Sequence, residues 1–279
     1  MIREKNYIDK IEMKLGISSY SFTWAVGVKG NYPAKRLTEL DLLDLANELN
    51  VGLVQIADNM PLHKMPEERF VNLLKKANEY HIVLETGANV MTESNLERYI
   101  LLAEKMGSRI LRFAIDGKDY HPGVSEIIPI IMNAEQELKS RNIVLALENH
   151  DRLFASDFIN IVEKVGSPHV GLCLDCANSL GLGEGFHEVV KELAPYTVNF
   201  HLKEVYIKRK YHMMGFDVEG RPFGEGCLPL EWMLEQLPPK CKTAILEQWT
   251  PPEESIEKTI EKERVWAEKS LSYLSKYFD

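Results

Sequence analysis

Four apolar runs in the second half of the chain carry an ionisable residue at or near their C-terminal ends. Such runs are typical of buried strands, where a charge is costly unless a partner compensates it. The four side chains are three carboxylates and one imidazole, which together offer three oxygen ligands and one nitrogen ligand. They are Glu148 in the run 143–148, Asp175 in 170–175, His201 in 198–203 and Glu247 in 243–248.

These four residues predict a site for one divalent metal ion. If the strand ends converge on the mouth of a barrel, the three carboxylates repel one another and a cation compensates them. The oxygen-rich donor set suits Mn²⁺, Mg²⁺ or Co²⁺, and Zn²⁺ is also compatible with it. The alternative is that each acid forms an isolated salt bridge, but four such residues at consecutive strand ends favour a shared ion.

Three other polar residues are candidate substrate contacts. Lys203 shares strand parity with His201, so a regular strand would point both side chains inward, although a strand-end lysine can also reach solvent. Asn178 lies three residues after Asp175. Arg112 lies in an otherwise apolar run and needs a partner there, which is either a structural acid or the substrate.

A long connection, 204–242, separates the last two runs and is locally basic. Long ordered loops in compact domains are usually functional, and in a barrel this one would stand over the active-site face. Its cations would suit a phosphate or carboxylate on the substrate, and the alternative is a solvated charge run. We expect His212 and Arg209 to be substrate contacts; the other basic residues of the connection are Lys208, Lys210 and Arg221.

Eight apolar runs that alternate with amphipathic segments predict an α/β fold. Near-continuous apolar character indicates strands buried on both faces, as in a parallel sheet. Thr92 and Gly107 are expected to cap one of the intervening helices, at its start and its end. The runs are 15–19, 53–57, 82–86, 110–115, 143–148, 170–175, 198–203 and 243–248.

This order predicts a single (β/α)₈ TIM barrel, a fold whose usual size is ~250 residues. The chain has 279 residues, and no linker rich in Pro, Gly or Ser divides it. We therefore expect one barrel domain at 13–279, preceded by an N-terminal extension at 1–12. A doubly wound open sheet is the alternative, but a glycine-rich dinucleotide turn is missing after the first run.

The composition excludes several classes of protein. The chain carries 33 Lys and Arg against 42 Asp and Glu, a net charge of −9, which argues against nucleic acid as a partner. No apolar run approaches the ~18 residues of a membrane span, and no secretory signal is evident. Four cysteines in a chain of this size indicate reduced thiols and a cytoplasmic location. The long final helix, expected over 255–278, is compatible with a homo-oligomer.

The chain also resembles the xylose isomerase-like superfamily of sugar phosphate isomerases and epimerases, which includes endonuclease IV-like enzymes. The matching segments are Leu-Glu-Asn at 147–149, Leu-Asp-Cys-Ala-Asn at 174–178, Phe-His-Leu-Lys-Glu at 200–204 and Leu-Glu-Gln at 246–248. The resemblance implies that the four matching positions bind one catalytic metal ion. It also implies that Glu148 and Glu247 are the catalytic acid/base pair. Asn178 departs from the pattern, because many sugar epimerases of this superfamily have histidine there.

These observations predict a metal-dependent isomerase or epimerase of a keto-sugar, sugar phosphate or sugar acid. A metal ion bound to a ketone and its neighbouring hydroxyl would stabilise an ene-diolate, while the two glutamates move the proton. The alternative is a lyase, because loss of CO₂ or of a β-hydroxyl from an oxo-sugar acid passes through the same ene-diolate. An endonuclease IV-like enzyme is disfavoured, since its extra histidines are replaced here by Gln55, Asp58 and Glu85.

Overall fold

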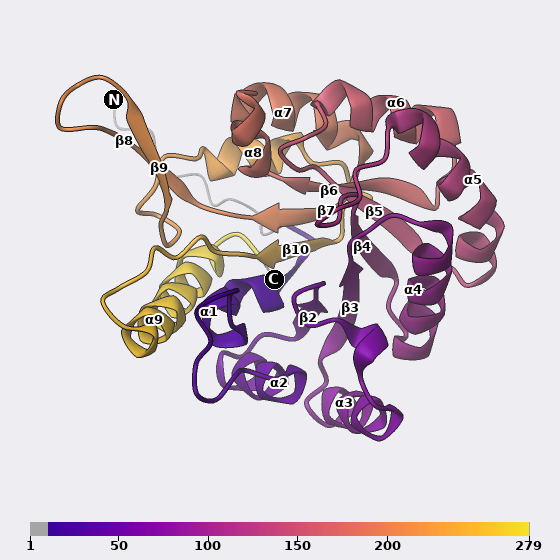
Figure 1. Cartoon of the computed structure of the whole chain (residues 1–279), viewed down its shortest axis with the longest axis horizontal. Coiled ribbons are helices and arrows are strands. Elements are labelled where there is room, and N and C mark those ends of the chain that lie inside the picture. The colour runs from indigo at the N-terminus through magenta and orange to yellow at the C-terminus, as the bar shows by residue number, and fades with distance from the viewer. Residues whose placement is uncertain (1–10, 279) are drawn as a thin grey trace.

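Eight parallel strands close into a barrel with helices on its outer side (Figure 1). The computed structural model describes residues 11–278, so most of the predicted extension at 1–12 lies outside the described residues. The barrel order β1-β10-β7-β6-β5-β4-β3-β2 confirms the predicted (β/α)₈ fold. The barrel strands are β1 Lys14–Ser18, β2 Leu53–Ile56, β3 Val83–Ala88, β4 Ile110–Ala114, β5 Val144–Glu148, β6 Val170–Asp175, β7 Thr197–Leu202 and β10 Thr243–Leu246.

The strands are buried on both faces, as their apolar sequences predict. Every residue of β2, β6 and β7 is buried, because the helices cover the outer face and side chains fill the barrel interior. The helices pack their apolar faces on this sheet. They are α1 Thr23–Val26, α2 Glu39–Glu48, α3 Glu67–Glu79, α4 Glu93–Met106, α5 Val124–Ser140, α6 Ala155–Val165, α7 Phe186–Leu193, α8 Leu230–Gln236 and α9 Ile256–Leu274.

Helix α4 shows how local sequence sets the element boundaries. The hydroxyl of Thr92 accepts a hydrogen bond from the backbone N–H of Asn95 at 3.3 Å, which satisfies one free donor of the first turn. Gly107 ends the helix with a φ of 67°, a left-handed conformation that glycine adopts at little cost. Both predicted caps are therefore confirmed.

The long connection after β7 folds into a hairpin rather than an irregular loop. Strands β8 (Val205–Arg209) and β9 (Phe216–Gly220) pair antiparallel and project away from the barrel, at the upper left of Figure 1. The chain then returns through α8 to β10. Among the helices that the structure describes, none is long and apolar enough to cross a membrane.

Gly16 lies where strands β1 and β2 approach each other closely. A Cβ atom at this position would lie 2.7 Å from Leu53 Cγ and 2.9 Å from the Leu53 carbonyl oxygen. We expect Gly16→Ala to lower the free energy of unfolding by about 1–3 kcal/mol, a typical cost of overpacking. Urea denaturation would measure this loss. Gly52→Ala is the matched control, because its nearest neighbour is the Lys14 side chain at 3.5 Å; equal losses in both variants would contradict the packing argument.

Candidate metal centre

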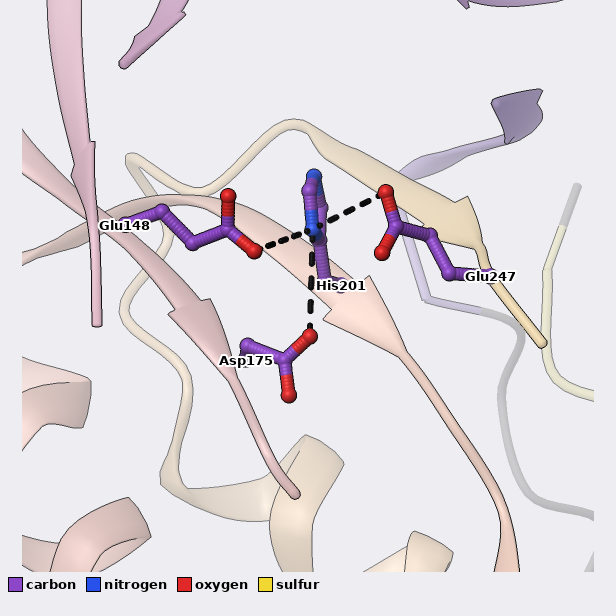
Figure 2. Close-up of side chains that lie close together, drawn as sticks. All are labelled: Glu148, Asp175, His201 and Glu247. Atoms are coloured by element: carbon purple, nitrogen blue, oxygen red, sulfur yellow. Dashed lines mark ion pairs between the residues drawn. The ribbon is translucent and has the colours of Figure 1, made fainter. Parts of the chain in front are cut away.

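Four barrel strands bring the predicted metal ligands to one point. Glu148 ends β5, Asp175 ends β6, His201 lies in β7 and Glu247 follows β10 directly. All four residues are buried, and one ligand atom from each lies within 4.8 Å of the others. Figure 2 shows the three carboxylates arranged around the imidazole of His201, with the two glutamates on opposite sides of the ring.

The atoms of this cluster fit a metal ion. His201 Nδ1 lies 3.3 Å from Glu148 Oε1, 3.4 Å from Glu247 Oε1 and 4.0 Å from Asp175 Oδ2. Neither His201 Nδ1 nor Glu247 Oε1 has a hydrogen-bond partner among residues 11–278. Buried polar atoms without partners are costly, and a divalent cation bound between them would satisfy both. The donor set of three carboxylates and one imidazole therefore fits a metal ion on the geometry of the chain itself.

Lys203 lies beside the cluster and neutralises part of its charge. Its Nζ atom lies 2.6 Å from Asp175 Oδ2 and 3.1 Å from Glu247 Oε2. Burial opposes the charged form of this lysine, but the two carboxylates outweigh that effect and raise its pKa. Burial alone would likewise raise the pKa of Glu247, yet the nearby positive charges of His201 and Lys203 lower it to about 2. Lys203 faces inward, as its strand parity predicts.

Arg112 is the buried cation on the other side of the cluster. Its Nη1 atom donates to Asp58 Oδ1 at 2.6 Å and to the Ala88 carbonyl oxygen at 3.2 Å, and its Nε contacts Glu148 Oε2. Burial would raise the pKa of Glu148, but the guanidinium charge of Arg112 holds it well below its usual range. The partners that the buried Arg112 needs are thus two carboxylates, those of Asp58 and Glu148, and Glu148 belongs to the metal cluster.

Asn178 links the two halves of the site. Its Nδ2 atom donates to Glu148 Oε1 at 3.2 Å, and its Oδ1 accepts from Lys203 Nζ at 3.2 Å. The backbone N–H of Asn178 also donates to Asp175 Oδ1 at 2.9 Å. Asn178 therefore contacts two cluster carboxylates and the buried lysine, in the position where the resemblance led us to expect a sugar contact.

Glu148 and Glu247 of the cluster line a cavity of about 610 Å³, large enough for a sugar-sized molecule. Tyr20, Trp24 and Trp249 form aromatic walls, and Lys203 Nζ lies 5.2 Å from the centre of the Trp249 ring. Trp249 stands two residues after Glu247, a candidate metal ligand. Other polar residues that line the cavity are Asn89, Asp116, His150, Asp151 and Glu219.

Hydrogen bonds connect Trp24, one residue of the aromatic wall, to the C-terminal helix α9. The buried carboxylate of Glu263, in α9, accepts hydrogen bonds from the backbone N–H groups of Trp24 at 3.0 Å and Ala25 at 3.1 Å. Burial raises the pKa of Glu263 to about 8. The indole N–H of Trp24 donates to the Thr250 carbonyl oxygen at 2.8 Å. These bonds fix the position of Trp24, and sequence reasoning missed the contribution of Glu263 because it is remote along the chain.

The two predicted contacts from the basic connection lie on the hairpin, outside the cavity walls. Arg209 donates from Nη1 to the Met213 carbonyl oxygen at 2.8 Å and stacks on the ring of Phe216. His212 is exposed near the turn of the hairpin. The hairpin instead contributes Val218, Glu219 and Gly220 to the cavity. A substrate-binding role for Arg209 and His212 stays a prediction, and the local pairing of Arg209 offers it no support.

Comparisons with known proteins agree with this architecture. The sequence profile of the xylose isomerase-like TIM barrel family matches residues 5–269. A 3-oxo-isoapionate decarboxylase from Pectobacterium atrosepticum is 28% identical over 264 residues, covering 94% of this chain and 95% of the relative.

Two solved structures share the fold at low sequence identity. A xylose isomerase-like TIM barrel protein from Mycobacterium smegmatis, in complex with magnesium, has a TM-score of 0.68 and 14% identity, covering 94% of this chain and 97% of its own. A D-psicose 3-epimerase crystallised in the presence of D-fructose has a TM-score of 0.69 and 15% identity, covering 95% and 99%.

Proposed function

The chain belongs to the xylose isomerase-like TIM barrel family, and from this premise we propose that it is a divalent-metal-dependent decarboxylase of a 3-oxo sugar acid. One observation carries the proposal: each glutamate of the metal cluster is paired with a buried cation, Glu148 with Arg112 and Glu247 with Lys203. The sequence placed isomerisation first and the lyase second. These ion pairs, together with the similarity to a decarboxylase, reverse that order.

The ion pairs favour decarboxylation because they make both glutamates weak bases. Isomerisation and epimerisation begin when a base removes a proton from carbon, and an adjacent cation lowers the basicity of a carboxylate. Loss of CO₂ needs no such base, since the electron pair comes from the breaking carbon–carbon bond. A 2-hydroxy-3-oxo acid would give the ene-diolate expected from the sequence in this way, so we propose that substrate class.

The same cations suit the carboxylate of the substrate. Arg112 lines the cavity, and its Nη2 atom makes no hydrogen bond to residues 11–278. We assign Nη2 to the substrate carboxylate, because charge-assisted hydrogen bonds to a buried guanidinium are strong. Asn178 and Lys203 are assigned to substrate hydroxyl groups nearer the cluster. Trp24 and Trp249 would cover the reacting carbons and exclude water from them.

The metal ligands are assigned as Glu148, Asp175, His201 and Glu247, with Mg²⁺ or Mn²⁺ as the preferred ion. A divalent cation held there would polarise the 3-oxo group and stabilise the negative charge that develops on its oxygen. Lys203 Nζ, 3.1 Å from Glu247 Oε2, is assigned to deliver the proton that replaces CO₂ at C2, and Glu247 is assigned to hold this ammonium group in position.

A second candidate is the isomerase or epimerase predicted from the sequence. Glu148 and Glu247 lie on opposite sides of His201 in Figure 2, so a substrate between them could be approached from both faces. The similarity in fold to a D-psicose 3-epimerase fits this alternative. In this reading the two glutamates act as the acid/base pair on a keto-sugar.

Incubation with a panel of substrates in D₂O separates the two candidates. We expect the Mg²⁺- or Mn²⁺-loaded protein to release CO₂ from a 2-hydroxy-3-oxo sugar acid and to place one deuterium at the former C2, as read by ¹H and ¹³C NMR. Protein stripped with a chelator is the control, and metal add-back should restore the reaction. Deuterium exchange into neutral ketoses without CO₂ release from any oxo acid would instead establish the epimerase candidate.

A further inference from the structure

A row of buried polar side chains fills the barrel interior beneath the metal cluster. Gln55 comes from β2, Glu85 from β3 and Asn199 from β7, and each is at most 3% exposed. Neighbouring barrel strands pair Gln55 with Glu85 in register, while Asn199 reaches them from across the barrel. A barrel core usually holds branched apolar residues, so this polar row calls for an explanation.

Gln55 connects this row to a metal ligand. Its Oε1 atom lies 2.8 Å from His201 Nε2, the ring nitrogen that faces away from the carboxylates of the cluster. Its Nε2 atom donates to Glu85 Oε2 at 3.0 Å and to Asn199 Oδ1 at 3.2 Å. A flipped amide would turn its oxygen toward these two acceptors, so the row fixes the orientation of Gln55.

The orientation of Asn199 is fixed in the same way. Its Nδ2 atom donates to Thr243 Oγ1 at 2.7 Å and to Glu85 Oε2 at 3.2 Å. Its Oδ1 atom accepts from the thiol of Cys173 at 3.1 Å as well as from Gln55. Both amides of the row therefore direct their nitrogen atoms at Glu85 Oε2, which accepts a hydrogen bond from each.

The oxygen of Gln55 determines which nitrogen of His201 carries a proton. An acceptor at 2.8 Å requires an N–H at Nε2, so Nδ1 is the nitrogen that gives up its proton when a metal ion binds the ring. Nδ1 faces Glu148, Asp175 and Glu247, and it has no hydrogen-bond partner in the part of the chain that the structure describes. We propose that Gln55 is a positioning residue that fixes this tautomer and ring orientation, so that His201 presents Nδ1 to the metal ion.

This inference rests on the metal centre of the proposed function but is independent of the reaction. Partners that hold the second nitrogen of a ligating histidine typically contribute about 10–100-fold to metal affinity. Here the partner is a neutral amide, and Glu85 is held one residue further away. The arrangement orients His201 without placing a fourth carboxylate against the cluster.

A metal titration of Gln55→Met tests the proposal. Methionine has a similar length and cannot accept the hydrogen bond well, so we expect the dissociation constant of Mn²⁺, measured by competition with a chelator, to rise about 10–100-fold. Thr86→Val is the matched control. Thr86 is a fully buried barrel residue whose Oγ1 has no hydrogen-bond partner among the described residues, and this variant should bind Mn²⁺ as the wild type does.

Long-range ¹⁵N NMR of the wild-type protein loaded with Mg²⁺ gives a second readout that does not depend on a variant folding. We expect the His201 signal to show a protonated Nε2 and an unprotonated Nδ1. A protonated Nδ1, wild-type Mn²⁺ affinity in folded Gln55→Met, or equal losses in Thr86→Val would each overturn the proposal. If the wild type binds no divalent ion, the proposed metal centre itself is wrong. If the wild type binds the ion but does not decarboxylate the substrate, only the proposed reaction is wrong and the role of Gln55 still holds.

Discussion

Replacing Glu247 with glutamine is expected to lower turnover by about 10²–10⁴-fold, the usual contribution of a positioned general acid or base. The amide keeps the shape of the side chain but removes the negative charge that faces His201 Nδ1 at 3.4 Å. It also replaces one of the two carboxylates that neutralise Lys203. We therefore expect weaker binding of the divalent ion together with the loss in turnover, measured by titration and by steady-state kinetics.

Saturating metal ion separates the two roles of Glu247. If the side chain is only a ligand, turnover should return once the weakened site is filled. If it also positions Lys203, the proton donor, kcat should stay low with the site full, and we expect this second result. Glu225→Gln is the control, because Glu225 is exposed and pairs with Lys269 on the surface. Normal kcat in Glu247→Gln would remove this residue from the proton transfer.

The barrel and the convergence of the four candidate metal ligands could be predicted because their signals are local. Each buried strand is a short apolar run, and the ligand positions stand at the ends of these runs, where barrel geometry brings strand ends together. Observed and predicted strand boundaries differ by at most two residues at either end. The convergence of Glu148, Asp175, His201 and Glu247 then follows from topology, without knowledge of any side-chain contact.

The contacts around the ligands could not be predicted, because they join residues that are remote in sequence. The sequence showed that Arg112 needs a partner but not that Asp58 and Glu148 share it. It marked Gln55 as unusual, yet only the closed barrel places it against His201. The functional role predicted for the basic connection stays a prediction, and composition alone does not say which way the Arg209 side chain points.

Replacing Arg112 with methionine is expected to have the largest effect on stability. The guanidinium is 2% exposed and holds Asp58 and Glu148 in one buried ion cluster. Removing one member of a buried ion pair leaves an uncompensated charge and typically costs about 3–5 kcal/mol. We expect a loss of this size in the free energy of unfolding, measured by urea denaturation in the presence of a chelator.

A divalent cation should recover part of this loss. Its charge lies near Glu148, so it can compensate the carboxylate that Arg112 leaves behind, and a ligand stabilises the state that binds it. Saturating Mg²⁺ should therefore raise the unfolding midpoint of Arg112→Met more than that of the wild type. Arg264→Met is the control, because Arg264 pairs with Glu48 and Glu268 on the surface, where ion pairs contribute little. If Mg²⁺ raised the unfolding midpoints of the wild type and of Arg112→Met equally, the ion would not compensate the charge of Glu148 in the variant. Arg112 would then play no part in the electrostatics of the metal centre.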